Sequence, residues 1–226
     1  MSRFGRKRGL LILAGLTICL TLLVTPAYAK KIFKLAHGDI EDPYLSPDAA
    51  AAIVFKSMFD SGTNGEVEVQ IFPGLVLGKE RELMEQLKNN LIQGNISSVG
   101  GMAPFWPLVG VLDTPFAVPN FSVAYDVLDG WFGDKLKKSI FEKTGMRCLE
   151  ITDANGFFSL TNSVRPVKTV EDVKGIKFRT MTLPSHIAFF KSMGASAIPI
   201  SWAEIYTSLQ TGVVDGQHNP LGYIIS

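Results

Sequence analysis

Residues 175–220 read GIKFRTMTLPSHIAFFKSMGASAIPISWAEIYTSLQTGVVDGQHNP, and their pattern indicates the fold class. The β-prone run Lys177–Thr180 predicts a strand, and Pro184–Met193 predicts a helix with proline at its start and glycine just after its end. Ser201 and Glu204 have the spacing of a capping box, so a second helix is expected to begin there. Strands that alternate with helices in this way are typical of an α/β protein with a parallel sheet.

The same alternation extends toward the N-terminus. We expect strands over Lys31–Ala36, Val67–Phe72 and Asn95–Val99, and helices over Ser46–Ser61, Lys79–Gln93 and Phe121–Lys143, the last with a break near Gly130–Gly133. The β-prone run Met146–Asn162 is longer than the usual strand of about six residues. A strand of that length often crosses between two lobes, so two lobes are expected.

The first 29 residues have the three-part pattern of a secretory signal peptide. A basic start (Arg3, Arg6, Lys7 and Arg8) precedes the apolar run Leu10–Val24, which ends in small residues up to Ala29. The apolar run of about 15 residues is shorter than the roughly 20 that span a bilayer. We therefore predict cleavage after Ala29 and no stable membrane insertion afterwards, rather than a single membrane anchor.

Composition excludes several classes of protein. The chain has 226 residues, of which 46% are hydrophobic and 19% charged, as in a foldable globular protein. Its formal net charge of +1 argues against a nucleic-acid binder that neutralises phosphates. Two cysteines cannot form a disulfide scaffold, and Cys148 alone remains after signal cleavage. Because Cys148 lies in an apolar run, we expect a buried strand residue.

No catalytic constellation is visible in the sequence. The three histidines, His37, His186 and His218, do not share metal-ligand spacing with a cysteine or carboxylate. A nucleophile elbow, a phosphate loop and a dinucleotide fingerprint are all missing. Binding is therefore favoured over catalysis, with no metal and no cofactor expected. The alternative is a secreted α/β hydrolase-like enzyme that recruits Cys148 or His218.

Arg179 is the candidate for ligand binding that the residues themselves indicate. It ends the predicted strand Lys177–Thr180, and α/β proteins bind small ligands at the carboxyl ends of their strands. A guanidinium can hold a carboxylate through two parallel charge-assisted hydrogen bonds. The alternative is a surface arginine at a strand end.

Several motifs together resemble those of the TRAP-transporter solute-binding proteins of the DctP type. They are GIKFR at 175–179, GAS at 194–196, PISWAEIY at 199–206, LQTG at 209–212, VDGQHNP at 214–220, FPGLVLGKERELMEQL at 72–87, and LTNS at 160–163 followed by Arg165-Pro166. They occur in the family's order and cover most of the chain beyond residue 29. A binding protein of an ATP-driven importer is a further alternative, against which the motif at 215–220 argues.

The resemblance implies an α/β, two-lobed periplasmic-binding-protein fold with a mixed sheet in each lobe and a ligand cleft between them. The first lobe would be residues 30–152 and the second residues 153–226. The resemblance also implies a periplasmic receptor that captures an organic acid and delivers it to TRAP membrane permease subunits, without a catalytic step. Family members continue well beyond the Asn-Pro motif, so the C-terminal part of the fold is expected to be missing and the second lobe incomplete.

The resemblance also assigns residues to the ligand site. Arg179 matches the family's carboxylate-binding arginine, and the amide of Asn219 matches a second donor to the same carboxylate. Four further positions are implied as ligand contacts: His37, Glu80, Thr182 and Trp202. Trp202 also has helical spacing suited to ordinary core, and His37 could instead be a solvent-facing loop residue.

Phe158 departs from the family pattern. Many members have a second arginine directly after the Gly-Phe pair, where this chain has Phe158. A second carboxylate clamp then lacks its arginine, which points to a monocarboxylate or to a ligand with an apolar part that Phe158 contacts. A lysine or histidine elsewhere could supply the charge instead.

Overall fold

The structure is a computed structural model that describes residues 30–154 and 156–225. The predicted signal peptide lies outside these residues. From Ile32 onward the chain forms one compact unit. Among the described residues, no helix combines the length and the apolar character that crossing a bilayer requires.

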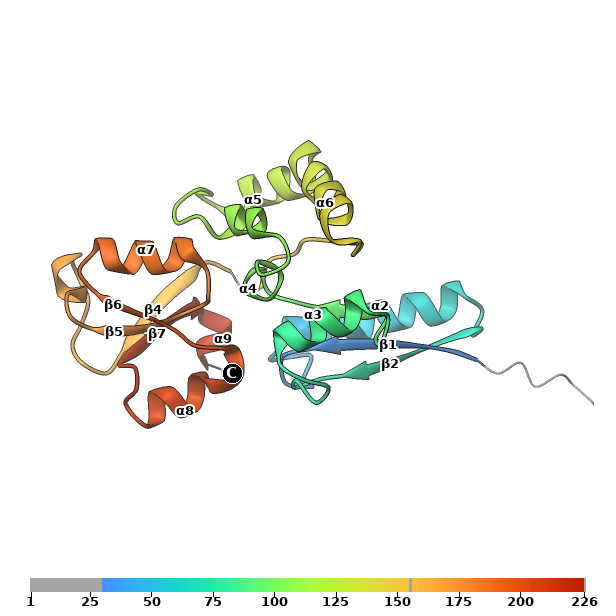
Figure 1. Cartoon of the computed structure of the whole chain (residues 1–226), viewed down its shortest axis with the longest axis horizontal. Coiled ribbons are helices and arrows are strands. Elements are labelled where there is room, and N and C mark those ends of the chain that lie inside the picture. Colours follow the sequence, from blue (N-terminus) through green and yellow to red (C-terminus); the bar gives the residue numbers. More distant parts are fainter. Residues whose placement is uncertain (1–29, 155, 226) are drawn as a thin grey trace, which may run out of the picture. The chain divides into compact units, whose positions relative to one another are not determined.

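The N-terminal sheet has the order β2-β1-β3, formed by β1 (Lys31–His37), β2 (Val67–Phe72) and β3 (Gly94–Ile96). Strands β1 and β3 are parallel. Leu35 packs with α2 (Pro47–Gly62), whereas Ala36 packs with α3 (Glu80–Lys88). Because consecutive strand residues point to opposite faces, the two helices cover opposite faces of this sheet (Figure 1).

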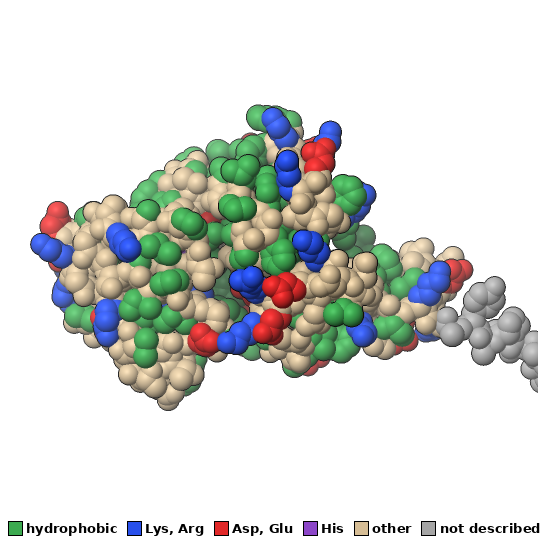
Figure 2. All heavy atoms as spheres, viewed as in Figure 1, with side chains coloured by type: hydrophobic (Ala, Val, Ile, Leu, Met, Phe, Trp, Pro, Cys, Tyr) green, Lys and Arg blue, Asp and Glu red, His purple; other side chains and the backbone are tan. Residues whose placement is uncertain are grey.

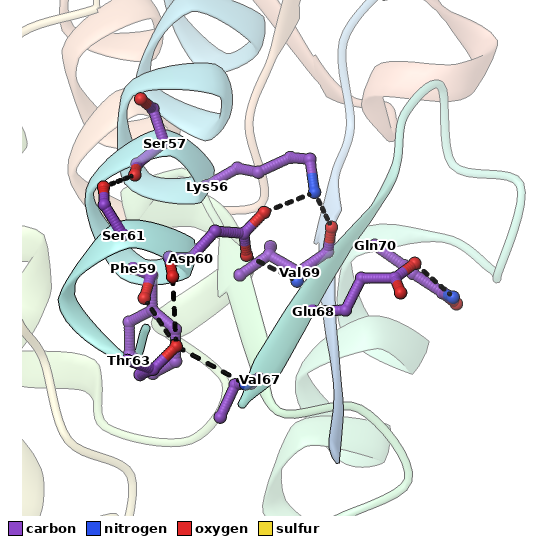
Figure 3. Close-up of polar contacts among 10 residues, drawn as sticks. All are labelled: Lys56, Ser57, Phe59, Asp60, Ser61, Thr63, Val67, Glu68, Val69 and Gln70. Carbon is purple, nitrogen blue, oxygen red and sulfur yellow. Dashed lines mark hydrogen bonds and ion pairs between the residues drawn. The ribbon is translucent and has the colours of Figure 1, made fainter. Parts of the chain in front are cut away.

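Side chains of α2 bond the backbone of β2, which stands at the edge of the sheet (Figure 3). The Lys56 ammonium donates to the Val69 carbonyl (2.6 Å) and to the Asp60 carboxylate (2.9 Å). The other oxygen of that carboxylate accepts from the Val69 N–H (3.0 Å). Both backbone groups of Val69 are thereby occupied, which protects an edge that could otherwise pair with another strand.

We expect Lys56→Ala to lower the free energy of unfolding by about 1 kcal/mol, because it leaves the part-buried Val69 carbonyl without its donor. Urea denaturation of the variant and of the unchanged protein measures this difference. Lys135→Ala, which removes an exposed lysine of the helix Trp131–Thr144, is the matched control. An equal loss in both variants would show that the contact with β2 contributes nothing.

A helical segment follows the first sheet. It comprises α4 (Val99–Met102), the 3-10 helix η1 (Pro107–Asp113), α5 (Phe121–Leu128) and α6 (Trp131–Thr144). The predicted break near residues 130–133 is confirmed, because α5 ends before it and α6 begins within it. This segment and α3 share one core, formed by Met84, Met102, Val109, Leu136, Ile140 and Met146. On the face drawn in Figure 2, acidic and basic side chains lie beside one another, and hydrophobic side chains gather over the region of α5.

The C-terminal sheet has the order β4-β7-β5-β6, formed by β4 (Phe158–Asn162), β5 (Lys177–Thr180), β6 (Ser196–Pro199) and β7 (Gly216–Pro220). Strand β4 is antiparallel to β7, whereas β5 is parallel to both β6 and β7, so the sheet is mixed. The helical elements are η2 (Glu171–Val173), α7 (Pro184–Ser192), η3 (Trp202–Glu204), α8 (Ile205–Gln210) and α9 (Leu221–Ile225). Phe178 on β5 and Phe190 on α7 stack in the hydrophobic core between this sheet and α7, with ring centroids 4.9 Å apart. The predicted α/β class is confirmed.

The long strand predicted over Met146–Asn162 is wrong. Only Phe158–Asn162 forms a strand, and the described residues of 146–157 have no helix or strand. Met146 belongs to the core of the helical segment instead, and Cys148 and Ile151 pack against that core. Their apolar pattern therefore reflects burial against helices and not a strand ladder. Cys148 is a half-buried thiol outside any strand, and burial raises its pKa.

Three other boundaries differ from expectation. Helix α3 ends at Lys88, because Asn90 takes a positive φ of 57° that turns the chain. The predicted strand Asn95–Val99 is shifted, since β3 ends at Ile96 and Val99 already begins α4. The predicted capping box at Ser201 does not form; the Ser201 side chain makes no cap hydrogen bond, and α8 begins only after η3.

Candidate anion-binding site

A cavity of about 770 Å³ collects residues from distant parts of the chain. Its lining comes from residues 75–81, 100–114, 179–185 and 200–203, among them Arg179 at the end region of β5. We call this space the Arg179 cavity. A second hollow, of about 860 Å³, is lined by the single segment 159–167 and gathers no distant groups. The Arg179 cavity is therefore the candidate site.

Arg179 is buried at 3% exposure and fixed in orientation. It stands between Ile198 on β6 and Gln217 on β7, and its Nε donates to the Ile200 carbonyl at 2.8 Å. Within the described residues, its two Nη groups have no hydrogen-bond acceptor and no carboxylate partner. Burial lowers the pKa of Arg179 to about 10, against a smaller raising effect of Glu80. The guanidinium is still charged at neutral pH, with two donors available to an anion.

The Asp-Gly pair of the motif at 215–220 holds β7 beside β5. The Asp215 carboxylate accepts from the Lys177 N–H (2.9 Å) and lies 3.3 Å from the Lys177 ammonium. A Cβ at Gly216 would overlap the backbone carbonyl of Thr161 on β4, so only glycine fits there. The motif thus fixes the register that places Gln217 opposite Arg179.

Three of the other predicted residues line the Arg179 cavity: Glu80, Thr182 and Trp202. One oxygen of Glu80, at the start of α3, accepts from the Ser98 N–H at 3.3 Å. Trp202 is half-buried and packs edge-on against Tyr223, with ring centroids 5.5 Å apart. Trp202 therefore both lines the cavity and packs against a neighbouring aromatic ring.

Asn219, His37 and Phe158 are not part of the lining. Asn219 is 5% exposed and donates to the Gln217 side chain at 2.7 Å. His37 is fully buried, neither ring nitrogen has a hydrogen-bond partner, and burial lowers its pKa, so the alternative of a solvent-facing residue is wrong. Phe158 is 40% exposed and stacks on His218 at 4.7 Å.

The cavity lining also contains residues that the sequence did not indicate. Four of them lie next to, or within two residues of, a predicted site residue in the sequence, so that residue could have indicated them: Lys79, Arg81, Met181 and Ser201. The lining residues of η1, such as Leu108, could not be predicted from the sequence, because their position depends on how η1 packs.

Two buried histidines lie near Arg179. The rings of His186 on α7 and His218 on β7 lie 4.6 Å apart, and Asp113 of η1 lies 3.7 Å from His186 Nε2. Burial, with a further contribution from Arg179, lowers the pKa of His186 to about 4. Burial and the neighbouring His186 lower that of His218 to about 3, and burial raises the pKa of Asp113 to about 6. At neutral pH the histidines are therefore uncharged and the contact with Asp113 is not an ion pair.

The described residues contain no cluster of three histidine, cysteine, aspartate or glutamate side chains that could hold a metal ion. The chemistry that this arrangement offers is anion binding by a fixed guanidinium. Hydrogen-bonding groups of Glu80, Thr182 and Ser201 stand in the same cavity.

Comparison with known proteins shows what the chain resembles. The family described as bacterial extracellular solute-binding protein, family 7 (DctP), matches residues 39–226. The 2,3-diketo-L-gulonate-binding periplasmic protein YiaO of Escherichia coli is 36% identical over 176 residues, which are 78% of this chain and 53% of that protein. The chain thus spans about half the length of this curated relative.

Two solved structures of TRAP periplasmic solute-binding proteins superpose well. One, from Bordetella bronchispeptica with density assigned to pantoate, has a TM-score of 0.82 and 37% identity, covering 87% of this chain and 64% of its own. The other, from Polaromonas sp. JS666 with bound D-erythronate, has a TM-score of 0.81 and 33% identity, covering 87% and 63%. The TM-scores show that both share the α/β fold of this chain over the matched region.

Proposed function

The chain belongs to family 7 of the bacterial extracellular solute-binding proteins, and we propose that it captures an organic acid by its carboxylate in the Arg179 cavity. The observation that carries this proposal is the state of Arg179. The guanidinium is buried, tied at Nε to the Ile200 carbonyl, and without a carboxylate partner among the described residues. A buried cation held in this way is a strong site for a carboxylate.

The ligand class follows from the chemistry of the relatives' ligands. Pantoate, D-erythronate and 2,3-diketo-L-gulonate each have a carboxylate on a short carbon chain that carries oxygen substituents. A cavity of about 770 Å³ suits a molecule of this size. Glu80, Thr182 and Trp202 share the cavity with Arg179 and are proposed as ligand contacts. For Asn219, His37 and Phe158 the proposal rests on the resemblance alone.

The wider role is also a proposal. We infer that residues 1–29 are removed on export, that residues 30–152 and 153–226 belong to the first and second lobes, and that the receptor works in the periplasm. Delivery of the acid to TRAP membrane permease subunits, with no catalytic step, is the corresponding partner proposal. The family and the TRAP assignment of the two solved relatives support it.

A thermal-shift screen of the purified protein against organic acids tests the function. The panel contains D-erythronate, pantoate, D-galactonate, succinate and aromatic acids, each paired with its carboxamide. A ligand at a hundred times its dissociation constant adds about 2.7 kcal/mol, which is a shift of several degrees. We expect a shift with at least one acid and none with its carboxamide. A folded protein that responds to no acid would overturn the proposal.

A further inference from the structure

Three cationic side chains line the Arg179 cavity, but two of them already have carboxylate partners. The Lys79 ammonium lies 2.6 Å from Glu204, and Arg81 Nε lies 3.1 Å from Glu85. Neither Glu204 nor Glu85 is part of the lining. Within the described part of the chain, Arg179 is thus the one lining cation that has no carboxylate partner.

The Lys79–Glu204 pair differs from the Arg81–Glu85 pair in what it connects. Arg81 and Glu85 are one turn apart on α3, whereas Lys79 precedes α3 and Glu204 ends η3, 125 residues further along the chain. Lys79 and its neighbour Glu80 stand on one wall of the cavity, and Trp202 and Ala203 stand on the wall that η3 provides. The hydrogen bond to Glu204 raises the pKa of Lys79 and lowers that of Glu204, so both are charged at neutral pH.

We propose that Glu204 is a specificity-determining residue, which holds the Lys79 ammonium and so makes the Arg179 cavity favour ligands with one carboxylate over those with two. This inference rests on the proposed function. A second carboxylate would have to displace Glu204 from Lys79 or remain in the cavity without a cation. The neutral hydroxyl end of a sugar acid meets no such cost and can bond with the polar groups of the lining.

The magnitude of the effect is limited by solvent. The Lys79 and Glu204 side chains are 57% and 52% exposed, so water and salt screen their interaction. Release of Lys79 should therefore change the preference between a monocarboxylate and a dicarboxylate by about three- to fivefold at low ionic strength, the upper part of the range of an exposed ion pair. High salt should reduce the change.

Glu204→Gln tests the proposal by calorimetric titration with two matched pairs of probes. D-Erythronate and meso-tartrate differ only in that the terminal hydroxymethyl group has become a carboxylate, and D-galactonate and galactarate differ in the same way. We expect Glu204→Gln to shift the ratio of the two dissociation constants about three- to fivefold toward the dicarboxylate. The same substitution in a Lys79→Gln background should leave the ratio unchanged.

Glu142→Gln is the matched control, because it removes one negative charge from a lysine–glutamate pair on α6, away from the cavity. It should leave the ratio as it is. A ratio that Glu204→Gln leaves unchanged would overturn the inference. If both members of a probe pair are then weakened equally, the ion pair holds the cavity walls together and does not select ligands. Absence of binding by every acid to the unchanged protein would instead contradict the proposed function.

Discussion

Arg179→Ala is expected to weaken binding of the captured acid at least tenfold. The guanidinium is fixed by the Ile200 carbonyl and offers two donors to one anion, and a hydrogen bond to a charged group contributes about 1.5–3 kcal/mol. Arg179→Lys should restore only part of the affinity, because an ammonium keeps the charge but not the paired geometry. Calorimetric titration with the acid selected by the thermal-shift screen measures all three dissociation constants.

The matched control is Arg81→Ala. Arg81 also lines the cavity, but its side chain is 73% exposed and paired with Glu85. Its removal should change affinity by less than about threefold. Similar losses for Arg81→Ala and Arg179→Ala would mean that the cavity attracts anions by its general positive charge, and the assignment of Arg179 as the anchor would be wrong.

Asp113→Asn is expected to stabilise the protein above pH 7 by up to about 3 kcal/mol, since one pKa unit corresponds to about 1.4 kcal/mol. The pKa of Asp113 is about 6 in the folded state against an ordinary 3.8, and its side chain is only 14% exposed. The folded state therefore binds the proton more tightly than the unfolded state. Stability falls as the pH rises from about 4 to about 6, and the amide removes this cost.

Urea denaturation at pH 7.5 and pH 4 measures the effect. The gain should vanish at pH 4, where the carboxyl of the folded protein is protonated. Asp126→Asn, at an exposed aspartate of α5, should change little at either pH. Destabilisation by Asp113→Asn at pH 7.5 would contradict this prediction, because it would mean that the ionised carboxylate makes a net favourable contact, such as an ion pair with a protonated His186.

The alternation of apolar and polar residues in the sequence predicted some of the secondary-structure elements correctly. Strand β2 was predicted with the bounds Val67–Phe72 that the structure has, because apolar Val67, Val69 and Ile71 alternate with polar residues in the sequence. Met146–Ile151 shows where this reasoning fails, since an apolar run buried against helices has the same composition as a strand. Periodicity alone does not distinguish the two.

Strand β7 could not be predicted from hydrophobicity. Its sequence, Gly216-Gln-His-Asn-Pro220, is polar, yet every residue is buried between β4 and β5. What places it there is local and specific: Asp215 bonds Lys177, and Gly216 permits close contact with Thr161. The signal for this strand was the motif as a whole and not the periodicity of its residues.

The candidate site was predictable only in part for a related reason. Arg179 follows from its place at the end of a strand, a property of local sequence. The ion pair between Lys79 and Glu204 joins segments 125 residues apart, and the contact between Asp113 and His186 depends on how η1 packs against α7. Long-range pairings of this kind arise from tertiary packing, for which one sequence carries no pattern.

The most direct test of carboxylate capture by Arg179 is a calorimetric titration of the purified protein with the acid that gives the largest thermal shift, and with its carboxamide. The two compounds share size and shape but differ in the charge that Arg179 is proposed to hold. We expect saturable one-to-one binding of the acid and at least tenfold weaker binding of the carboxamide. Equal affinity for both compounds would contradict this expectation.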